Sequence, residues 1–233
     1  MKQLLDRPQG KISLGIAIVA LLAIFAGAFY VFGGNGARTS NTGALTASTL
    51  VPTGGGAIFT IDSSGSEASF TIDEVLLGQQ NTVVGATSQV VGQIQVDKDE
   101  PSKSQVGQIK VDLTGLKTDN DRRDNTIQGR ILETGDANNQ FAVFTPKSIS
   151  GLPESVTVGQ AFTFQITGDL TIHGVTRSAT FDTTATLESD SKLTGQAQTT
   201  IKYKDFDINI PSVPSVAGVS DTVKLALNFT AHS

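Results

Sequence analysis

Strict alternation of apolar and polar residues in two neighbouring segments is the strongest constraint on the fold. Residues 162–172, FTFQITGDLTI, alternate with a period of two, and residues 175–187 repeat the pattern after the dipeptide His173-Gly174. A period of two places the apolar side chains on one face of a strand, and a short turn with glycine joins two such strands. One dry face and one wet face are typical of an antiparallel sheet.

The same alternation recurs in shorter segments along the chain. They are residues 68–72, 109–113, 141–143, 201–203 and 223–230, and residues 81–96 add one or two more strands. About eight strands with short turns between them predict an all-β antiparallel barrel or sandwich. The charge-dense segment 119–133 breaks the rhythm and places Ile127 and Ile131 at helical spacing, so we expect a short helix there.

The composition excludes several classes of function. The 233 residues include no cysteine, which excludes disulfides, thiolate-held clusters and a thiol nucleophile. His173 and His232 are the two histidines and share no ligand spacing, so we expect no metal site and no cofactor. The excess of 22 acidic over 17 basic residues argues against nucleic acid as a partner, because phosphate neutralisation requires a basic face.

An uncharged apolar run occupies residues 12–32, ISLGIAIVALLAIFAGAFYVF. As a helix at 1.5 Å per residue, it would match a hydrocarbon core of about 30 Å. Lys2, Arg7 and Lys11 precede the run, and the next basic residue is Arg38. The positive-inside rule therefore leaves residues 1–11 in the cytoplasm and exports everything after the helix.

Two interpretations of this segment remain open. The small residues Ala26-Gly27-Ala28 resemble a signal-peptidase site, but the apolar run continues to Phe32, which favours an uncleaved signal anchor. Both interpretations export the domain. We therefore expect a single-pass protein of the cell membrane, whose C-terminal domain is periplasmic or at the cell surface.

Residues 33–57 contain 7 Gly and 7 Ser or Thr among 25 residues, with one charge, and predict a flexible tether. The remaining residues, 58–233, form the expected domain. Without the five charges before residue 58, this domain keeps 13 basic and 21 acidic residues, or about −8 in formal charge. Electrostatic attraction to an anionic bilayer is therefore not expected.

Four motifs in this domain resemble the YceI-like proteins. They are Phe59-Thr-Ile61-Asp-Ser63 with the strand at 68–72, Leu116 to Asp124, the hairpin GDLTIHGVT at 168–176, and Val219-Ser-Asp-Thr-Val223. The sequence departs from the family's motifs at 123–129, at Glu133 and at 63–67, where the family's His is absent. The resemblance implies a lipocalin-like, eight-stranded antiparallel barrel that holds an isoprenoid or other long-chain lipid, for instance a quinone. Self-association as a homodimer is left open.

Nine apolar residues fall on the dry phase of the expected strands and are candidates to line the lumen. They are Phe70, Ile72, Phe162, Phe164, Ile166, Phe181, Leu225, Leu227 and Phe229. The alternative is that the same side chains simply fill a core, as in a structural or interaction domain at the cell surface.

Charged residues offer fewer candidates. Arg122, Arg123 and Asp124, with Asp119 nearby, could contact a polar head group at the barrel mouth, or they could belong to a solvated helix N-terminus. His173 is expected to be an exposed turn residue. Asp205 and Asp207 could form a carboxylate pair, but alternation near a strand end explains them, so an enzyme is not expected.

The orientation of the membrane segment gives a first prediction. A reporter enzyme fused after Ser233 should be active only on the extracytoplasmic side, because the basic residues precede the apolar run. Cytoplasmic activity of the fusion would contradict this orientation. The intact mass of the mature protein distinguishes the two interpretations of the segment: loss of residues up to about Ala28 would identify a cleaved signal peptide.

Overall fold

The computed structural model describes residues 45–52, 54–212 and 216–233. The expected membrane segment at 12–32 lies outside these residues, and no helix among them is long and apolar enough to cross a bilayer. The strands are β1 (Ala57–Ile61), β2 (Glu67–Leu76), β3 (Gln79–Thr87), β4 (Val90–Val91), β5 (Gln93–Val96), β6 (Gln105–Val106), β7 (Ile109–Asp112), β8 (Phe141–Ser150), β9 (Ala161–Ile172), β10 (Val175–Ser189), β11 (Lys192–Lys202), β12 (Val216–Val219) and β13 (Thr222–His232). The helical elements are η1 (Ser63–Gly65), η2 (Pro101–Lys103), α1 (Asp121–Thr126), η3 (Ile127–Ile131) and η4 (Tyr203–Phe206).

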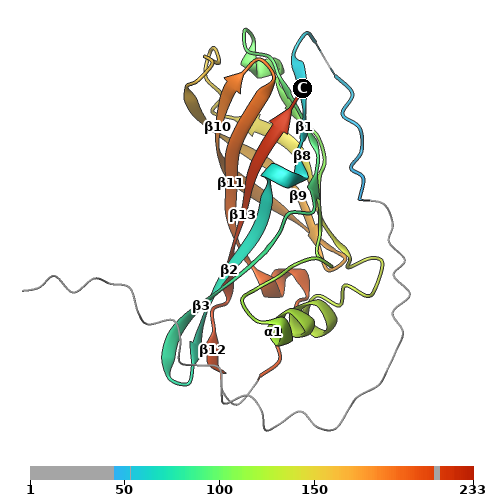
Figure 1. The fold of residues 1–233 in the computed structure, drawn as a ribbon, viewed down its shortest axis with the longest axis vertical. Helices are drawn as coiled ribbons and strands as arrows, with labels where there is room; N and C mark the ends of the chain where they lie inside the picture. Colours follow the sequence, from blue (N-terminus) through green and yellow to red (C-terminus); the bar gives the residue numbers. More distant parts are fainter. Residues whose placement is uncertain (1–44, 53, 213–215) are drawn as a thin grey trace, which may run out of the picture. The chain divides into compact units, whose positions relative to one another are not determined.

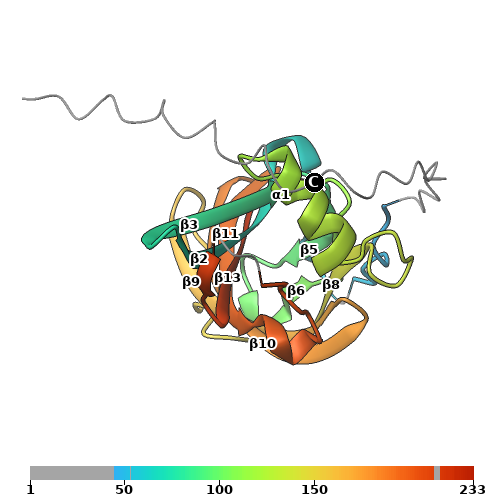
Figure 2. The same cartoon turned by 90° about the horizontal axis from the view of Figure 1, so that it is seen from below.

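All these strands belong to one curled sheet in which the pairings are antiparallel (Figures 1 and 2). Along the main path the order is β4-β7-β8-β9-β10-β11-β13-β1-β5-β6. Only Gly92 separates β4 from β5, and these two strands pair with β7 and β1 respectively. The segment around Gly92 therefore connects distant parts of the path and curls the sheet round its interior.

The long hairpin predicted from the alternation is confirmed. β9 and β10 pair over twelve residues each, from Ile172↔Val175 to Ala161↔Thr186. His173 and Gly174 form the turn with φ values of 52° and 71°. Positive φ at both central residues gives a turn whose twist matches that of the flanking strands, and glycine adopts it without a steric penalty.

The number of strands differs from the expected eight, since the sheet has thirteen. Part of the excess arises because residues 81–96, expected to add one or two strands, contribute to β3, β4 and β5, with Gly92 between the last two. The rest includes β12, which was not predicted and pairs with the extension of β2 beyond the expected strand: β2 leaves β13 after Thr71 and continues as an arm with β3 and β12. Figure 1 shows this arm extending toward the end of the sheet at which α1 lies.

Part of the expected flexible tether lies against the domain. The backbone N–H of Leu50 donates a hydrogen bond to Oε1 of Gln93 at 3.0 Å, and the Leu50 side chain is buried. Gly107 leaves the space that Leu50 fills, since a Cβ there would lie 3.1 Å from Leu50 Cδ1. Leu50 is thus in contact with the sheet.

The interior of the curl is a single apolar cluster. Most of the strands contribute buried side chains to it, among them Phe59 of β1, Leu193 of β11 and Ala231 of β13. Phe206 of η4 joins the same cluster and is 2% exposed. Apolar side chains on the inner faces of strands that are far apart in the chain therefore pack together, as the alternation predicts.

Gly92 gives a prediction about this closure. A Cβ at residue 92 would lie 2.4 Å from Ile109 Cδ1 and 3.3 Å from Ile61 Cδ1, so Gly92→Ala must displace side chains of both β7 and β1. We expect a loss of about 1–3 kcal/mol in the free energy of unfolding, measured in urea. Gly135→Ala is the control, because a Cβ there meets nothing within 4 Å. Equal stability of the two variants would contradict the role of Gly92.

Candidate functional site

The nine candidate lining residues all belong to, or pack against, the one apolar cluster inside the curl. Ile72, Ile166 and Phe229 are buried. The other six are half-buried: Phe70, Phe162, Phe164, Phe181, Leu225 and Leu227. The inner face is therefore apolar across β2, β9, β10 and β13, but six of the nine side chains keep some contact with solvent.

The strand register assembles these residues into rows across the sheet. Phe181 of β10 lies opposite Ile166 of β9, and Leu225 of β13 lies opposite Phe70 of β2. Directly opposed residues have neighbouring side chains on the same face. Smaller residues lie on the inner face of β11 between these rows, for instance Ala197, which lies opposite Leu227 of β13. Large side chains thus alternate with small ones along the inner face.

Three of the inner rings lie on a glycine of the adjacent strand. A Cβ at Gly85 would lie 2.2 Å from the Phe70 ring, one at Gly195 would lie 2.6 Å from the Phe229 ring, and one at Gly168 would lie 2.9 Å from the Phe144 ring. The rings occupy the space that side chains at these positions would take. They therefore lie along the sheet instead of projecting into the interior.

Aromatic pairs fix two further rings. Phe162 and Phe164 stack with centroids 5.6 Å apart, and Phe144 meets Phe181 edge to face at 4.8 Å. Such geometries stabilise aromatic pairs beyond the area that they bury. The inner face therefore offers an apolar surface with ordered rings, which suits a slender apolar ligand.

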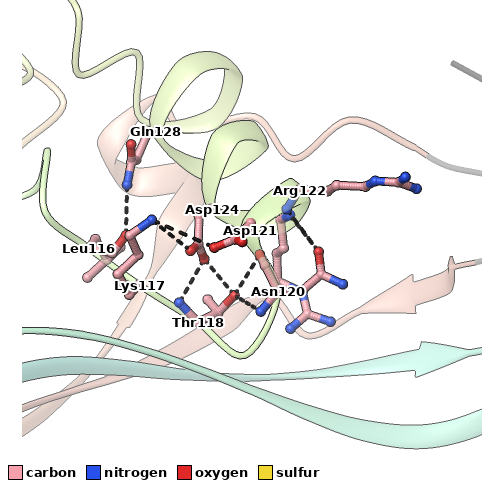
Figure 3. A network of polar contacts seen from close by, with 9 residues as sticks. Leu116, Lys117, Thr118, Asn120, Asp121, Arg122, Asp124 and Gln128 are labelled. Atoms are coloured by element: carbon pink, nitrogen blue, oxygen red, sulfur yellow. Dashed lines mark hydrogen bonds and ion pairs between the residues drawn. The ribbon is translucent and has the colours of Figure 1, made fainter. Parts of the chain in front are cut away.

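The polar candidates lie on the helical segment that sequence analysis predicted, now seen as α1 followed by the π-helical turn η3. Asn120 caps α1, because its side-chain oxygen accepts hydrogen bonds from the backbone N–H groups of Arg122 and Arg123. Arg123 also makes an ion pair with Asp119. The side chain of Arg122 points away from this cluster (Figure 3).

Asp124 holds the helix to the preceding loop (Figure 3). Its Oδ1 accepts hydrogen bonds from the backbone N–H and the hydroxyl of Thr118, both at 2.7 Å. Its Oδ2 lies 3.4 Å from Nζ of Lys117, and the side chain is 2% exposed. Burial acts to raise the pKa of Asp124, but the hydrogen bonds from Thr118 and Lys117 outweigh it, so the pKa lies below its usual range.

These contacts indicate a structural role for Asp124. Its carboxylate is buried and accepts its hydrogen bonds within the loop, and the suggested contact with a head group at the mouth stays a prediction. The charged segment DNDRRD contains both the cap and the buried anchor of one short helix. The sequence alone does not distinguish the buried Asp124 from its exposed neighbours, because burial depends on how the helix packs.

His173 differs from the expected exposed turn residue. Its side chain is 17% exposed, and Nε2 lies 3.6 Å from Oε2 of Glu133. The turn between β9 and β10 packs against the segment after η3, which covers the imidazole. Asp205 lies in η4 and Asp207 follows it, and both are exposed. Among the described residues, no three His, Cys, Asp or Glu side chains gather as metal ligands would.

Sequence analysis missed a cation on the inner phase of β10. Arg177 lies opposite Leu170 of β9 and two residues from the buried Ala179, so it shares their face of the sheet. It is exposed near the end of β10. The signal was present in the alternation VTRSATF, where arginine takes an apolar position.

A curled antiparallel sheet with an apolar inner face defines a lipocalin-like protein. The family model of the YceI-like domain matches residues 59–231, and the chain belongs to this family. The structural expectation from the sequence motifs is thus confirmed at the level of the family. A search of curated proteins gives no match.

Solved structures with a similar fold share little sequence with this chain. A polyisoprenoid-binding domain from Saccharophagus degradans has a TM-score of 0.59 at 17% identity, covering 75% of this chain and 98% of its own. BcnA of Burkholderia cenocepacia has a TM-score of 0.58 at 17% identity, covering 73% and 98%. The YceI protein of Campylobacter jejuni has a TM-score of 0.51 at 19% identity, covering 64% and 84%. At such identities the likeness shows the fold alone.

Asp124 gives a prediction with a defined pH dependence. Asp124→Asn weakens charge-assisted hydrogen bonds to a buried group, so we expect a loss of about 1–3 kcal/mol in the free energy of unfolding at pH 7. Because the folded-state pKa is lowered, the carboxylate stabilises the fold above its unfolded pKa of about 3.9, and this contribution disappears as pH falls through the folded pKa.

The difference between Asp124→Asn and the unaltered protein should therefore narrow in urea unfolding below about pH 4. Asp121→Asn is the matched control on the same helix, since the Asp121 side chain is 96% exposed and should cost less than about 0.5 kcal/mol. A similar loss in both variants, or a difference that widens on acidification, would contradict the anchoring role.

Proposed function

We propose that this protein binds one long isoprenoid-type lipid, for which a quinone is a candidate, against the inner face of its curled sheet. The six half-buried apolar side chains on that face carry the proposal. They combine ordered rings with incomplete burial, and an apolar chain that covered them would remove that surface from water. A polyisoprenoid-binding domain with the same fold is consistent with this function.

We also propose that the protein holds this lipid outside the cytoplasm. The apolar run at 12–32 and the preceding basic residues support a single membrane anchor, with the lipid-binding domain periplasmic or at the cell surface. Such a tether would keep the domain close to the bilayer that contains its ligand, for transport, storage or sequestration. A binding role without catalysis fits an inner face that is almost entirely apolar.

The second candidate is a structural or interaction domain whose interior binds nothing. It would require that the half-buried side chains pack as tightly as an ordinary core. Lipid extracted from the purified full chain and identified by mass spectrometry would distinguish the two candidates directly.

Phe164 gives the corresponding prediction for a variant. A buried core Phe→Ala usually costs about 3–5 kcal/mol, and a ring beside a ligand site should cost clearly less, because less packing is lost. We therefore expect a smaller loss of stability for Phe164→Ala, together with weaker lipid retention. Phe59→Ala is the matched control, since Phe59 is 1% exposed and belongs to the core cluster.

Urea unfolding and lipid quantification should be measured on the same preparations. Equal stability losses for the two variants, with no lipid in the unaltered protein, would contradict lipid binding and favour the structural domain.

A further inference from the structure

β10 and β11 part before either strand ends. Their ladder begins at Ser189↔Lys192 near the hairpin turn and stops at Asp182↔Gln198. Beyond that pair, residues 175–181 of β10 continue to pair with β9, and residues 199–202 of β11 continue to pair with β13. The sheet is therefore open between these two strands, although both keep their outer neighbours.

The turn η4 lies at this opening, between the ends of the two strands. It follows β11 directly and contacts both β10 and β11, and Figure 2 shows it beside β10. Phe206 of η4 is 2% exposed and lies in the core cluster, so its ring anchors the turn in the interior. Lys204 of the same turn donates to Oδ1 of Asp221 at 2.6 Å, which ties the turn to the segment before β13.

A cavity of about 470 Å³ lies in the opening. Its walls include Arg177 and Ala179, on one face of β10, and also Ser178 and Thr180, on the other. A strand contributes both faces to one cavity only when the cavity lies along its edge. The space, called here the β10–β11 opening, therefore passes between the strands at the side of the sheet.

The lining of the opening combines apolar and charged side chains. Ala179, Ile201 and Phe206 line it and belong to, or pack against, the apolar cluster inside the curl. Arg177, on the inner phase of β10, and Lys202, on the outer phase of β11, line it too, and both are exposed. Side chains of the apolar cluster therefore line the opening beside two exposed cations that flank it from the two faces of the sheet, a combination that suits an amphiphile.

The charged groups favour an anion. Among the lining residues, Arg177 and Lys202 contribute two positive charges and Asp205 one negative charge, with hydroxyls of Thr199, Thr200 and other residues beside them. The carboxylate of Asp221 also lies within electrostatic reach of Lys202, but its ion pair is with Lys204. Neither cation makes an ion pair with a carboxylate among the described residues. The Arg177 guanidinium donates a hydrogen bond to the backbone oxygen of Thr176 at 3.0 Å, and its other N–H groups are left for a ligand.

We propose that the β10–β11 opening binds the phosphate head group of an isoprenoid-type amphiphile whose tail lies on the inner face of the sheet. This inference rests on the proposed lipid binding and specifies the ligand: a prenyl phosphate in preference to a neutral prenol or quinone. The guanidinium of Arg177 is suited to a bidentate contact with phosphate oxygens, and Lys202 supplies a second positive charge.

Binding of three probes to the purified full chain tests the proposal: geranylgeranyl phosphate, geranylgeraniol and inorganic phosphate. In the unaltered protein, we expect the prenyl phosphate to bind about tenfold more tightly than the prenol, because the phosphate gains charge-assisted hydrogen bonds that the prenol hydroxyl cannot make. The double variant Arg177→Gln/Lys202→Gln should remove this advantage and leave prenol binding unchanged. Lys192→Gln/Lys147→Gln, which removes two positive charges elsewhere, is the control and should keep the advantage.

The outcomes separate this inference from the proposed function. Equal affinity for the two prenyl probes, or an advantage that survives in the Arg177/Lys202 variant, would overturn the head-group site while lipid binding stands. Inorganic phosphate that binds as tightly as the prenyl phosphate would overturn the amphiphile and indicate a free-anion site. Absence of binding by both prenyl probes would overturn lipid binding itself, and this inference with it.

A second measurement covers the case in which the double variant fails to fold. The chain has no cysteine, so Ser178→Cys gives one labelling site in the opening and Ser189→Cys gives a matched site at the other end of β10. A bulky thiosulfonate label at residue 178 should weaken geranylgeranyl phosphate binding several-fold, and reductant should restore it. Equal effects at residues 178 and 189 would contradict the opening as the head-group site.

Discussion

The packing of phenylalanine rings on glycines of adjacent strands determines the character of the inner face. Phe70, Phe144 and Phe229 each lie on a glycine of the neighbouring strand. A strand face that carries so many rings would ordinarily fill the interior of a narrow barrel, because such an interior is just wide enough for side chains. Glycine gives each ring a place beside the sheet, so that several rings pack on one face without projecting into the interior.

Side-chain packing also explains where the sheet is open. β10 and β11 separate where η4 places the buried ring of Phe206 between the strand ends. Continued pairing would occupy the volume that this ring fills. The backbone at Asp207, with φ of 54°, then redirects the chain out of the turn. The gap is thus a consequence of packing in the turn after β11, and the ladder itself contains no irregularity that ends it.

The sequence predicted the fold class, the main strands and the family, but it predicted the number of strands and the polar groups of the site less well. Strict alternation identified β9, β10 and β13 because apolar residues at every second position define the buried face. The expected number of strands was too low because residues 81–96 contribute to three strands, with Gly92 between β4 and β5, and because β12 and the end of β2 that pairs with it have no strict alternation. Contacts with partners distant in the chain decide both features.

The polar groups of the site show the limit of local patterns most clearly. Asp124 appeared equivalent to its charged neighbours, yet helix packing makes it the buried member of the group. Arg177, by contrast, carried a usable signal, because it violates the apolar phase of its strand. A charged residue on the dry phase near a strand end is worth examining as a contact at the mouth of a sheet, since an unpaired charge deeper inside would be costly.

Charge over the whole domain constrains how such a contact could act. Residues 58–233 carry about −8 in formal charge, so an anionic ligand meets a repulsive field at long range. Screening at physiological ionic strength reduces that field beyond about 8 Å, whereas contacts inside a partly dry opening are screened much less. Selection of an anionic head group would therefore depend on close contact with Arg177 and Lys202. Attraction from a distance would contribute little, and an apolar tail would first have to bring the ligand to the opening.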